Sequence, residues 1–330
     1  MSVLGERGYR NFWISGAFSD IGLNIWFLGA VWLVLNLTDS IAWVGLVGGI
    51  TAAPALLTLL GGALGDRWNR RNIVVGSRAA WFAMGLAIAL LVLTDSIEPW
   101  HILLGALSVA LADSIGSPAN GALIVDLVGK PKLLAATSMG ELANYTGEII
   151  APLLVGVLIA SIGIDSTFYA AAIALGMGVY FILRVPITPA VVDQSREQQN
   201  LLSDIRDGFR YARRSPGIAP LLLLAARMLF GAALFPMIPI YARDILEVGS
   251  TGFAVMMAAL GAGFIVGSLV GALGAVGKRG LVIFGLIAVW DAGMVIFSQT
   301  DWYALTVALI FVMASRERSR ITSSQRQSSN

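Results

Sequence analysis

The stretch that decides the fold runs from residue 41 to residue 94. It reads IAWVGLVGGITAAPALLTLLGGAL (41–64), then GDRWNRR (65–71), then NIVVGSRAAWFAMGLAIALLVLT (72–94). Each outer part exceeds the roughly 20 mostly apolar residues that an α-helix needs to cross the hydrocarbon core of a bilayer. The middle part has only a few residues and is rich in arginine, so it is a connection and not a further helix. The stretch therefore predicts two membrane helices joined by a tight basic turn.

The composition extends this prediction to the whole chain. Of the 330 residues, 57% are hydrophobic and 13% are charged, and the mean hydropathy is +0.79. A soluble domain of this length would expose far more charge, so most of the chain must face lipid or other helices. The net charge of only +2 gives no case for nucleic-acid binding, and the absence of cysteine excludes disulfides and thiolate metal sites.

Apolar runs of membrane length recur along the chain. They cover roughly 12–36, 41–64, 72–94, 100–126, 134–162, 166–184, 217–242, 251–276 and 280–298, and a tenth begins near Trp302 and ends at Ala314. Isolated strands cannot satisfy their backbone in lipid, so we expect helices. The sequence thus predicts an all-α polytopic membrane protein with about ten membrane helices. Because the tenth run is short and a polar segment follows it, we expect the chain to be truncated at its carboxy-terminal end.

The charges of the connecting loops alternate. The basic set comprises Arg7, Arg10, Arg67, Arg70, Arg71, Lys130, Lys132, Arg196, Arg206, Arg210, Arg213, Arg214, Lys278 and Arg279. The other set reads NLTDS, TDSIEP, GIDS, DILEVGS and SQTDW, and Arg243 is its one basic residue. Short loops rich in lysine and arginine stay cytoplasmic. We therefore expect a multi-pass protein of the cell (inner or plasma) membrane with a cytoplasmic amino terminus.

Four segments follow from this pattern. They are a six-helix bundle (1–184), a cytoplasmic linker (185–216), an incomplete second bundle (217–314) and a polar cytoplasmic tail (315–330). The linker places Leu201, Leu202, Ile205 and Phe209 on one helical face, which predicts an amphipathic helix on the membrane surface. A site for calmodulin or a partner helix is the alternative. The tetrapeptide GALG recurs at 62–65 and 271–274 before a basic turn each time, which indicates two related halves.

Two motifs resemble those of the major facilitator superfamily. GALGDRWNRR (62–71) is similar to its signature loop G-x-L-x-D-R-x-G-R-R/K, with Asn69 in place of the second glycine; asparagine can also take a left-handed turn. GEIIAPLLVG (147–156) resembles the antiporter motif of the fifth span. The SPANGALIVDLV run in span four is similar to the macrolide-efflux and siderophore-exporter branch. The resemblance implies a twelve-helix fold, of which this chain would hold about ten helices.

The resemblance also implies roles for the motif residues. It assigns a cytoplasmic gate to Gly62, Gly65, Asp66, Arg67, Arg70, Arg71 and Asp126, and an antiporter-like helix contact to Gly147, Pro152 and Gly156. Arg70 can reach Asp126 at the inner end of span four. The alternative for the basic loop is that these residues only keep it on the cytoplasmic side.

Ionisable residues within the spans are costly and mark functional sites. Asp20, Asp113 and Arg227 lie in spans one, four and seven, roughly 12, 18 and 15 Å from the cytoplasmic ends at about 1.5 Å per residue. These spans line the cavity in the family that the chain resembles, so the three charges and Glu148 are the candidate cavity residues. They could hold a substrate cation, or a proton exchanged against substrate. A static ion pair between the two halves is the alternative. Glu141, nearer the inner surface, is interpreted as a solvated or helix-pairing residue.

The sequence therefore predicts a secondary active transporter that exports drugs or small metabolites, macrolide-like or siderophore-like, by ion-coupled alternating access. The expected partners are a small-molecule substrate, the lipid bilayer and a proton or cation gradient, and we expect a monomer without cofactor or metal. No phosphate-binding loop, H-E-x-x-H or G-x-S-x-G motif occurs, so an enzyme is not expected. A truncated remnant that no longer transports, or an assembly partner of a membrane complex, is the alternative.

Overall fold

The computed structural model of the chain describes residues 3–52, 69–186, 234–273 and 292–325. Within these ranges the regular elements are helices. The amino-terminal part holds η1 (Val3–Gly5), α1 (Arg7–Thr38), α2 (Ile41–Ala52), α4 (Arg70–Leu93), α5 (Pro99–Val128), η3 (Lys130–Lys132), α6 (Leu133–Ser161) and α7 (Asp165–Leu183). The remainder holds α10 (Leu234–Ile240), the π-helical turn η4 (Tyr241–Ile245), α11 (Gly249–Leu273) and α13 (Tyr303–Gln325).

The helices agree with the predicted spans. Among the described residues, six helices are long and apolar enough to cross a membrane, and they fall on spans one, three, four, five, six and eight. The predicted and observed ends differ by a few residues at most positions. The predicted polar tail begins inside α13, which continues past Ala314 to Gln325. The linker 185–216 beyond Pro186, most of span seven and the first GALG repeat lie outside the described residues.

Local capping chemistry sets several helix ends. Glu98 and His101 form a capping box at the start of α5, where the Glu98 backbone N–H donates to His101 Nδ1 at 2.9 Å. Asn69 is the N-cap of α4, and its Oδ1 accepts hydrogen bonds from the backbone N–H groups of Arg71 and Asn72. Asn69 does not use the left-handed turn that asparagine can adopt: its φ is −63°, and its side chain satisfies the free N–H groups of the next helix.

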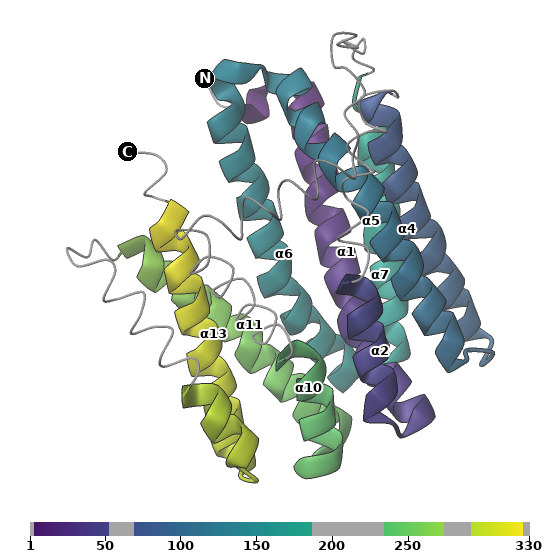
Figure 1. The fold of residues 1–330 in the computed structure, drawn as a ribbon, viewed down its shortest axis with the longest axis vertical. Coiled ribbons are helices and arrows are strands. Elements are labelled where there is room, and N and C mark those ends of the chain that lie inside the picture. Colours follow the sequence, from purple (N-terminus) through teal and green to yellow (C-terminus); the bar gives the residue numbers. More distant parts are fainter. Residues whose placement is uncertain (1–2, 53–68, 187–233, 274–291, 326–330) are drawn as a thin grey trace, which may run out of the picture.

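The amino-terminal helices pack around α1. Figure 1 shows α1 between α6 on one side and α4 and α5 on the other, and α7 also packs along it. Small residues bring these helices close together. A Cβ on Gly22 of α1 would lie 2.9 Å from Leu175 of α7, so only glycine fits there at this spacing. The result is a bundle in which one face of α1 meets α7 while other faces remain for α5 and α6.

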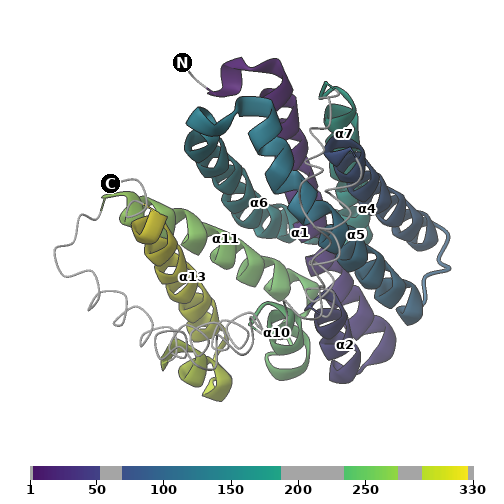
Figure 2. The ribbon, with the colours of Figure 1, turned by 45° about the horizontal axis from the view of Figure 1, so that its top comes forward.

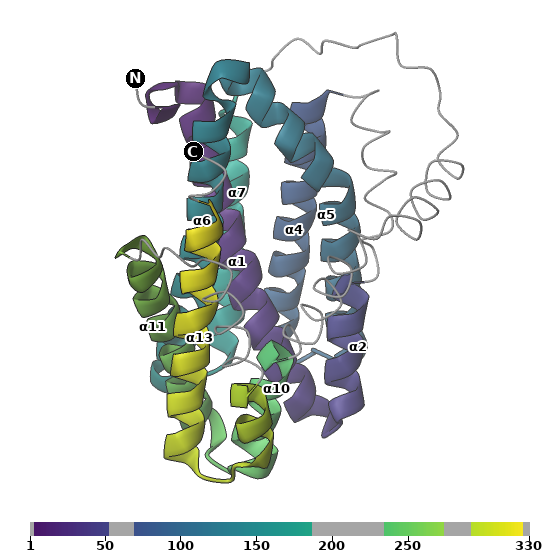
Figure 3. The ribbon, with the colours of Figure 1, turned by 60° about the vertical axis from the view of Figure 1, so that its left-hand side comes forward.

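The helices of the second part lie on the α6 side of this bundle. α11 packs against both α6 and α13, and α10 contacts α1 and α2 (Figures 2 and 3). Gly156 of α6 meets the backbone of α11, where an added Cβ would lie 2.6 Å from the carbonyl oxygen of Ala254. The two parts of the chain are thus held together by a close helix contact between α6 and α11.

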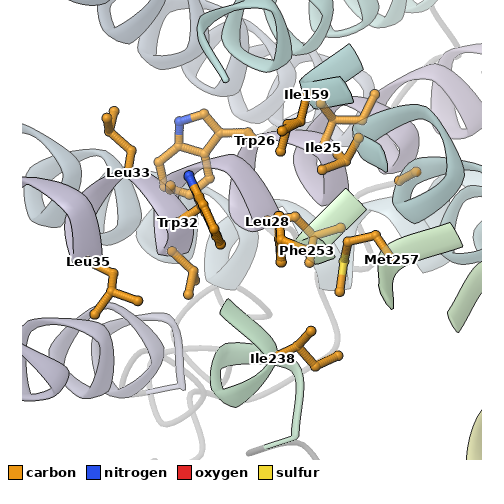
Figure 4. Close-up of a cluster of buried hydrophobic side chains, with 14 of the residues drawn as sticks. Ile25, Trp26, Leu28, Trp32, Leu33, Leu35, Ile159, Ile238, Phe253 and Met257 are labelled. Atoms are coloured by element: carbon orange, nitrogen blue, oxygen red, sulfur yellow. The ribbon is translucent and has the colours of Figure 1, made fainter. Parts of the chain in front are cut away.

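Two apolar cores occupy opposite ends of the bundle. One lies at the amino-terminal end of α1 and includes Tyr9, Phe12 and Leu123. The other lies around the carboxy-terminal half of α1 and joins it to α10 and α11. Figure 4 shows Leu28 and Trp32 of α1 beside Phe253 and Met257 of α11. The Trp32 and Phe253 rings stack with their centroids 4.4 Å apart. This second core is an apolar seal between the two parts of the chain.

Candidate functional site

A cavity of about 400 Å³ lies among α1, α4, α5 and α6. Its volume is in the usual range for small-molecule sites, about 300–1,000 Å³. Its wall combines aromatic and polar side chains, and its ionisable members are Asp20, Arg78, Asp113 and Glu141. The apolar second core separates this cavity from the opposite end of the bundle. Such a concentration of charge within membrane helices makes the cavity the candidate functional site.

Asp20 and Asp113 both lie on the wall of this cavity, from α1 and α5. Asp20 is half-buried against α6, because Gly147 has no side chain. A Cβ on Gly147 would lie 3.3 Å from the Cβ of Asp20. Asp113 is exposed to the cavity. The structure thus brings together two of the residues that the sequence proposes, although they lie in different spans.

The other two predicted cavity residues are placed differently. Arg227 lies outside the described residues, so its relation to the cavity stays a prediction. Glu148 of α6 is absent from the cavity wall but interacts electrostatically with Asp20. Glu141, which the sequence left as a solvated residue, is exposed and lines the cavity. On the cavity wall, Glu141 therefore stands where the sequence predicted Glu148.

Arg78 of α4 is the cavity residue that sequence reasoning missed. It is 5% exposed. Its guanidinium donates to Ser15 Oγ of α1 and, at 3.3 Å, to Asn120 Oδ1 of α5, and its Cζ lies 5.5 Å from the centroid of the Phe12 ring. The signal was present in the sequence, since Arg78 lies inside the apolar run 72–94. The rule that identified Asp20 as an intramembrane charge applies equally to it.

The expected contact of the signature loop is present at one end of the bundle. Arg70 Nη1 lies 2.8 Å from Asp126 Oδ1 and 3.0 Å from Oδ2, which joins α4 to α5. Arg71 instead turns to α7, where its Nε donates to the Val185 carbonyl oxygen at 2.6 Å and its Nη2 to that of Leu183 at 2.8 Å. The other members of the motif, Gly62, Gly65, Asp66 and Arg67, lie outside the described residues.

The fifth-span motif lies along two helix contacts of α6. Gly147 meets α1 at Asp20, and Gly156, about two and a half turns later, meets α11. Pro152 lies inside α6 between them. From the other side, Gly261 of α11 meets the backbone of α6, where a Cβ would lie 2.9 Å from the carbonyl oxygen of Ile149. In this chain the motif glycines act as contact points that set the distance of α6 from its neighbours.

An ion pair joins the two parts of the chain at the end opposite to the cavity. Arg243 Nη1 lies 2.9 Å from Asp39 Oδ1 and donates to the Leu35 carbonyl oxygen at 2.6 Å. Asp39 is the left-handed C-cap of α1, so Arg243 binds a helix end whose carbonyls carry partial negative charge. The contact explains why a lone arginine occurs among the acidic loops. It holds η4 against α1.

Comparisons with known proteins identify the family and the fold. A family model described as transmembrane secretion effector matches residues 1–320. Among curated proteins, the enterobactin exporter EntS of Escherichia coli O139:H28 is 24% identical over 323 residues, covering 92% of this chain and 75% of the relative. EntS of Shigella boydii serotype 18 matches with the same identity and coverage.

Solved transporters share the fold at low identity. A bacterial homologue of the human lysosomal transporter Spinster, in an inward-facing and unoccupied conformation, is 17% identical with a TM-score of 0.68, over 97% of this chain and 74% of that one. The nucleoside transporter NupG is 14% identical with a TM-score of 0.65, over 95% and 80% of the two chains. These likenesses establish the membrane-helix architecture.

Proposed function

The chain belongs to the major facilitator superfamily, in its family of transmembrane secretion effectors, and from that premise we propose that it exports amphiphilic small molecules in exchange for protons. The observation that carries the proposal is the cavity with Asp20 and Asp113 on its wall. Carboxylates are rare within membrane helices and often mark proton pathways, so Asp20 and Asp113 could bind and release protons during transport.

The arrangement of cavity and seal supports alternating access. The cavity lies among the amino-terminal part of α1, the carboxy-terminal part of α5 and the early part of α6. The second core and the Arg243–Asp39 ion pair close the opposite end. With the amino terminus in the cytoplasm, as we propose from the loop charges, this state would receive substrate from inside. Opening of the seal would then release it outside.

The cavity wall favours a substrate with both positive charge and apolar surface. Three acidic side chains, Asp20, Asp113 and Glu141, lie on the described wall with one arginine, so the described wall is acidic in composition. Phe12, Trp13 and Trp81 add aromatic faces, which bind apolar surface and attract cations. A macrolide with a protonated amine meets both requirements. A siderophore is the second candidate, because the similar EntS proteins are enterobactin exporters.

The test is accumulation in bacterial cells that lack their own exporters. Cells that produce the chain should retain less radiolabelled erythromycin than cells with an empty vector. Asp113→Asn should abolish the difference, whereas the matched change Asp165→Asn, at an exposed position in the first turn of α7, should preserve it. Each variant is checked for membrane insertion. The same cells are tested with enterobactin. If the unmodified chain lowers the cellular accumulation of neither compound, the proposal is contradicted.

A further inference from the structure

Two glycines on the cavity wall have no packing role among the described residues. They are Gly121 of α5 and Gly140 of α6. A Cβ on either would meet no described atom within 4 Å, whereas Gly147 and Gly156 each lie against a neighbouring helix. Glycine destabilises a helix interior relative to alanine, and close helix contact is the usual compensation. In the described part of the chain, Gly121 and Gly140 border the cavity instead.

The two glycines lie at the same depth on helices that are joined end to end. α5 ends at Val128 and α6 begins at Leu133, and each glycine lies seven residues from that end of its helix. At about 1.5 Å per residue, both are about 10 Å from the connection. α5 and α6 diverge from this connection, and α1 lies between them (Figures 1 and 3). Gly121 is exposed and Gly140 is half-buried, so the cavity reaches the surface at this level.

The neighbouring positions on the same helix faces carry side chains. Residues three or four apart share one face of a helix, and the cavity residues at this spacing are Ser117, Gly121 and Ile124 on α5 and Thr137, Gly140 and Asn144 on α6. The glycine is the middle member of each set. Both helices therefore lack a side chain at the same level of the wall.

We propose that Gly121 and Gly140 form an entry window through which substrate passes between α5 and α6 into the cavity, and that the width of this window limits the size of the substrate. One turn farther from the connection, Ser117 and Asn144 are exposed and line the cavity. A molecule that passes the glycines therefore meets hydrogen-bonding groups that can orient it. The inference rests on the proposed function, because it concerns how a substrate reaches its site.

Thiol labelling of the purified chain in detergent tests the window without any transport. The chain contains no cysteine, so Gly16→Cys places a single thiol on α1, on the cavity wall and on a different helix from both glycines of the window. A side chain fits at this position, since a Cβ would contact only Arg78 Nη2, at 3.7 Å, among the described atoms. The thiol is reacted with the small reagent N-ethylmaleimide and, separately, with the bulky reagent fluorescein-5-maleimide.

Leucine in the window should slow the bulky reagent selectively. Gly121→Leu and Gly140→Leu should each lower the rate with fluorescein-5-maleimide about tenfold, equivalent to about 1.4 kcal/mol in the barrier, and leave the rate with N-ethylmaleimide nearly unchanged. Gly121→Ala and Gly140→Ala should act in the same direction but less, because alanine fills less of the window. The matched control is Gly76→Leu, which should leave both rates unchanged. Gly76 is exposed on α4 and absent from the cavity wall, with open space where a Cβ would lie.

Two outcomes would overturn the proposal. One is a rate with fluorescein-5-maleimide that is the same in both leucine variants as in Gly16→Cys alone. The other is equal slowing of the two reagents, which would indicate a general change of structure and not a narrower window. If the leucine variants do not fold, the alanine variants are judged by the same two criteria. Failure of the erythromycin and enterobactin assays would contradict the proposed function alone, because labelling requires no transport.

Discussion

Arg70 and Arg71 are neighbours in the sequence but make different contacts in the structure. Arg70 forms a partly exposed ion pair with Asp126, and such pairs contribute about 0–1 kcal/mol to stability. Arg71 donates to two backbone carbonyls at the end of α7. Those carbonyls lack helical partners, and a cation at a helix carboxy terminus is favourable. The two arginines therefore make separable contributions.

We predict that Arg71→Gln destabilises the protein more than Arg70→Gln does. Loss of Arg71 leaves the Leu183 and Val185 carbonyls without their donor, at a cost of about 1–3 kcal/mol, whereas loss of Arg70 costs about 1 kcal/mol or less. Thermal unfolding of the two variants in the same detergent measures the difference. Equal melting temperatures would show that the contact of Arg71 with α7 does not stabilise the fold.

At this scale the sequence predicted some contacts and missed others. The pair of Arg70 with Asp126 could be expected because opposite charges ended neighbouring spans at the same membrane surface. Arg71 with α7 could not, since its acceptors are backbone atoms that every residue possesses. Arg78 could have been found by the rule for intramembrane charges. Its partners Ser15 and Asn120 could not, because the sequence does not show which side chains of neighbouring helices face Arg78.

At the scale of whole elements, glycines determine how closely α6 and α11 pack. A side chain at Gly156 would meet the Ala254 backbone oxygen, which cannot rotate away, so α11 must move. We predict that Gly156→Ala lowers stability by about 1–3 kcal/mol, the usual cost of overpacking. Gly76→Ala is the matched control: Gly76 is also helical, in α4, with open space where a Cβ would lie.

Unfolding of both variants by heat in detergent measures the cost. Gly76→Ala should melt at the original temperature or slightly above it, because alanine favours helices over glycine. Gly156→Ala should melt lower. A Gly156→Ala protein as stable as the Gly76→Ala control would mean that the two helices are not in close backbone contact.

The elements themselves were largely predictable, but their faces were not. Long apolar runs separated by polar turns located α1, α4, α5, α6 and α7 to within a few residues. Membrane helices are apolar all round, so hydropathy does not say which side meets a neighbour and which meets lipid. That is why hydropathy assigned Asp20 and Asp113 to spans, whereas their shared cavity was suggested by the family resemblance and not by the pattern of residues.

At the scale of the molecule, the Arg243–Asp39 ion pair and the second core keep one end closed. We predict that Arg243→Gln opens this end more often, because it removes the ion pair and the donor to Leu35. The chain contains no cysteine, so Ala254→Cys provides a single reporter in the α6–α11 contact. A membrane-impermeant maleimide should label this cysteine faster when Arg243→Gln is added.

The matched control for this experiment is Glu247→Gln. Glu247 is an exposed charged residue after η4, and its neutralisation removes a charge from the same loop without touching the pair. Its labelling rate should equal that of Ala254→Cys alone. Equal rates for Arg243→Gln and Glu247→Gln would contradict a role of the ion pair in closure.

The orientation of the whole molecule is testable by the same chemistry. We predict that single cysteines at Ser96 and Asp165 react with an impermeant maleimide added to intact cells, because both exposed positions lie in the acidic, outer loops. A cysteine at exposed Lys130 should react only after the cells are permeabilised. If Lys130→Cys is labelled in intact cells and the other two cysteines are not, the topology is the reverse of the one we predict.

The central claim is that Asp20 couples export to protons, and flux in proteoliposomes tests it most directly. The purified chain is reconstituted, a pH gradient is imposed, and uptake is followed for whichever of erythromycin or enterobactin the cells export. The unmodified chain should accumulate the compound against its gradient, and a protonophore should abolish this. Asp20→Asn should still exchange compound across the membrane at equilibrium but should not concentrate it. Accumulation by Asp20→Asn to the level of the unmodified chain would contradict the account.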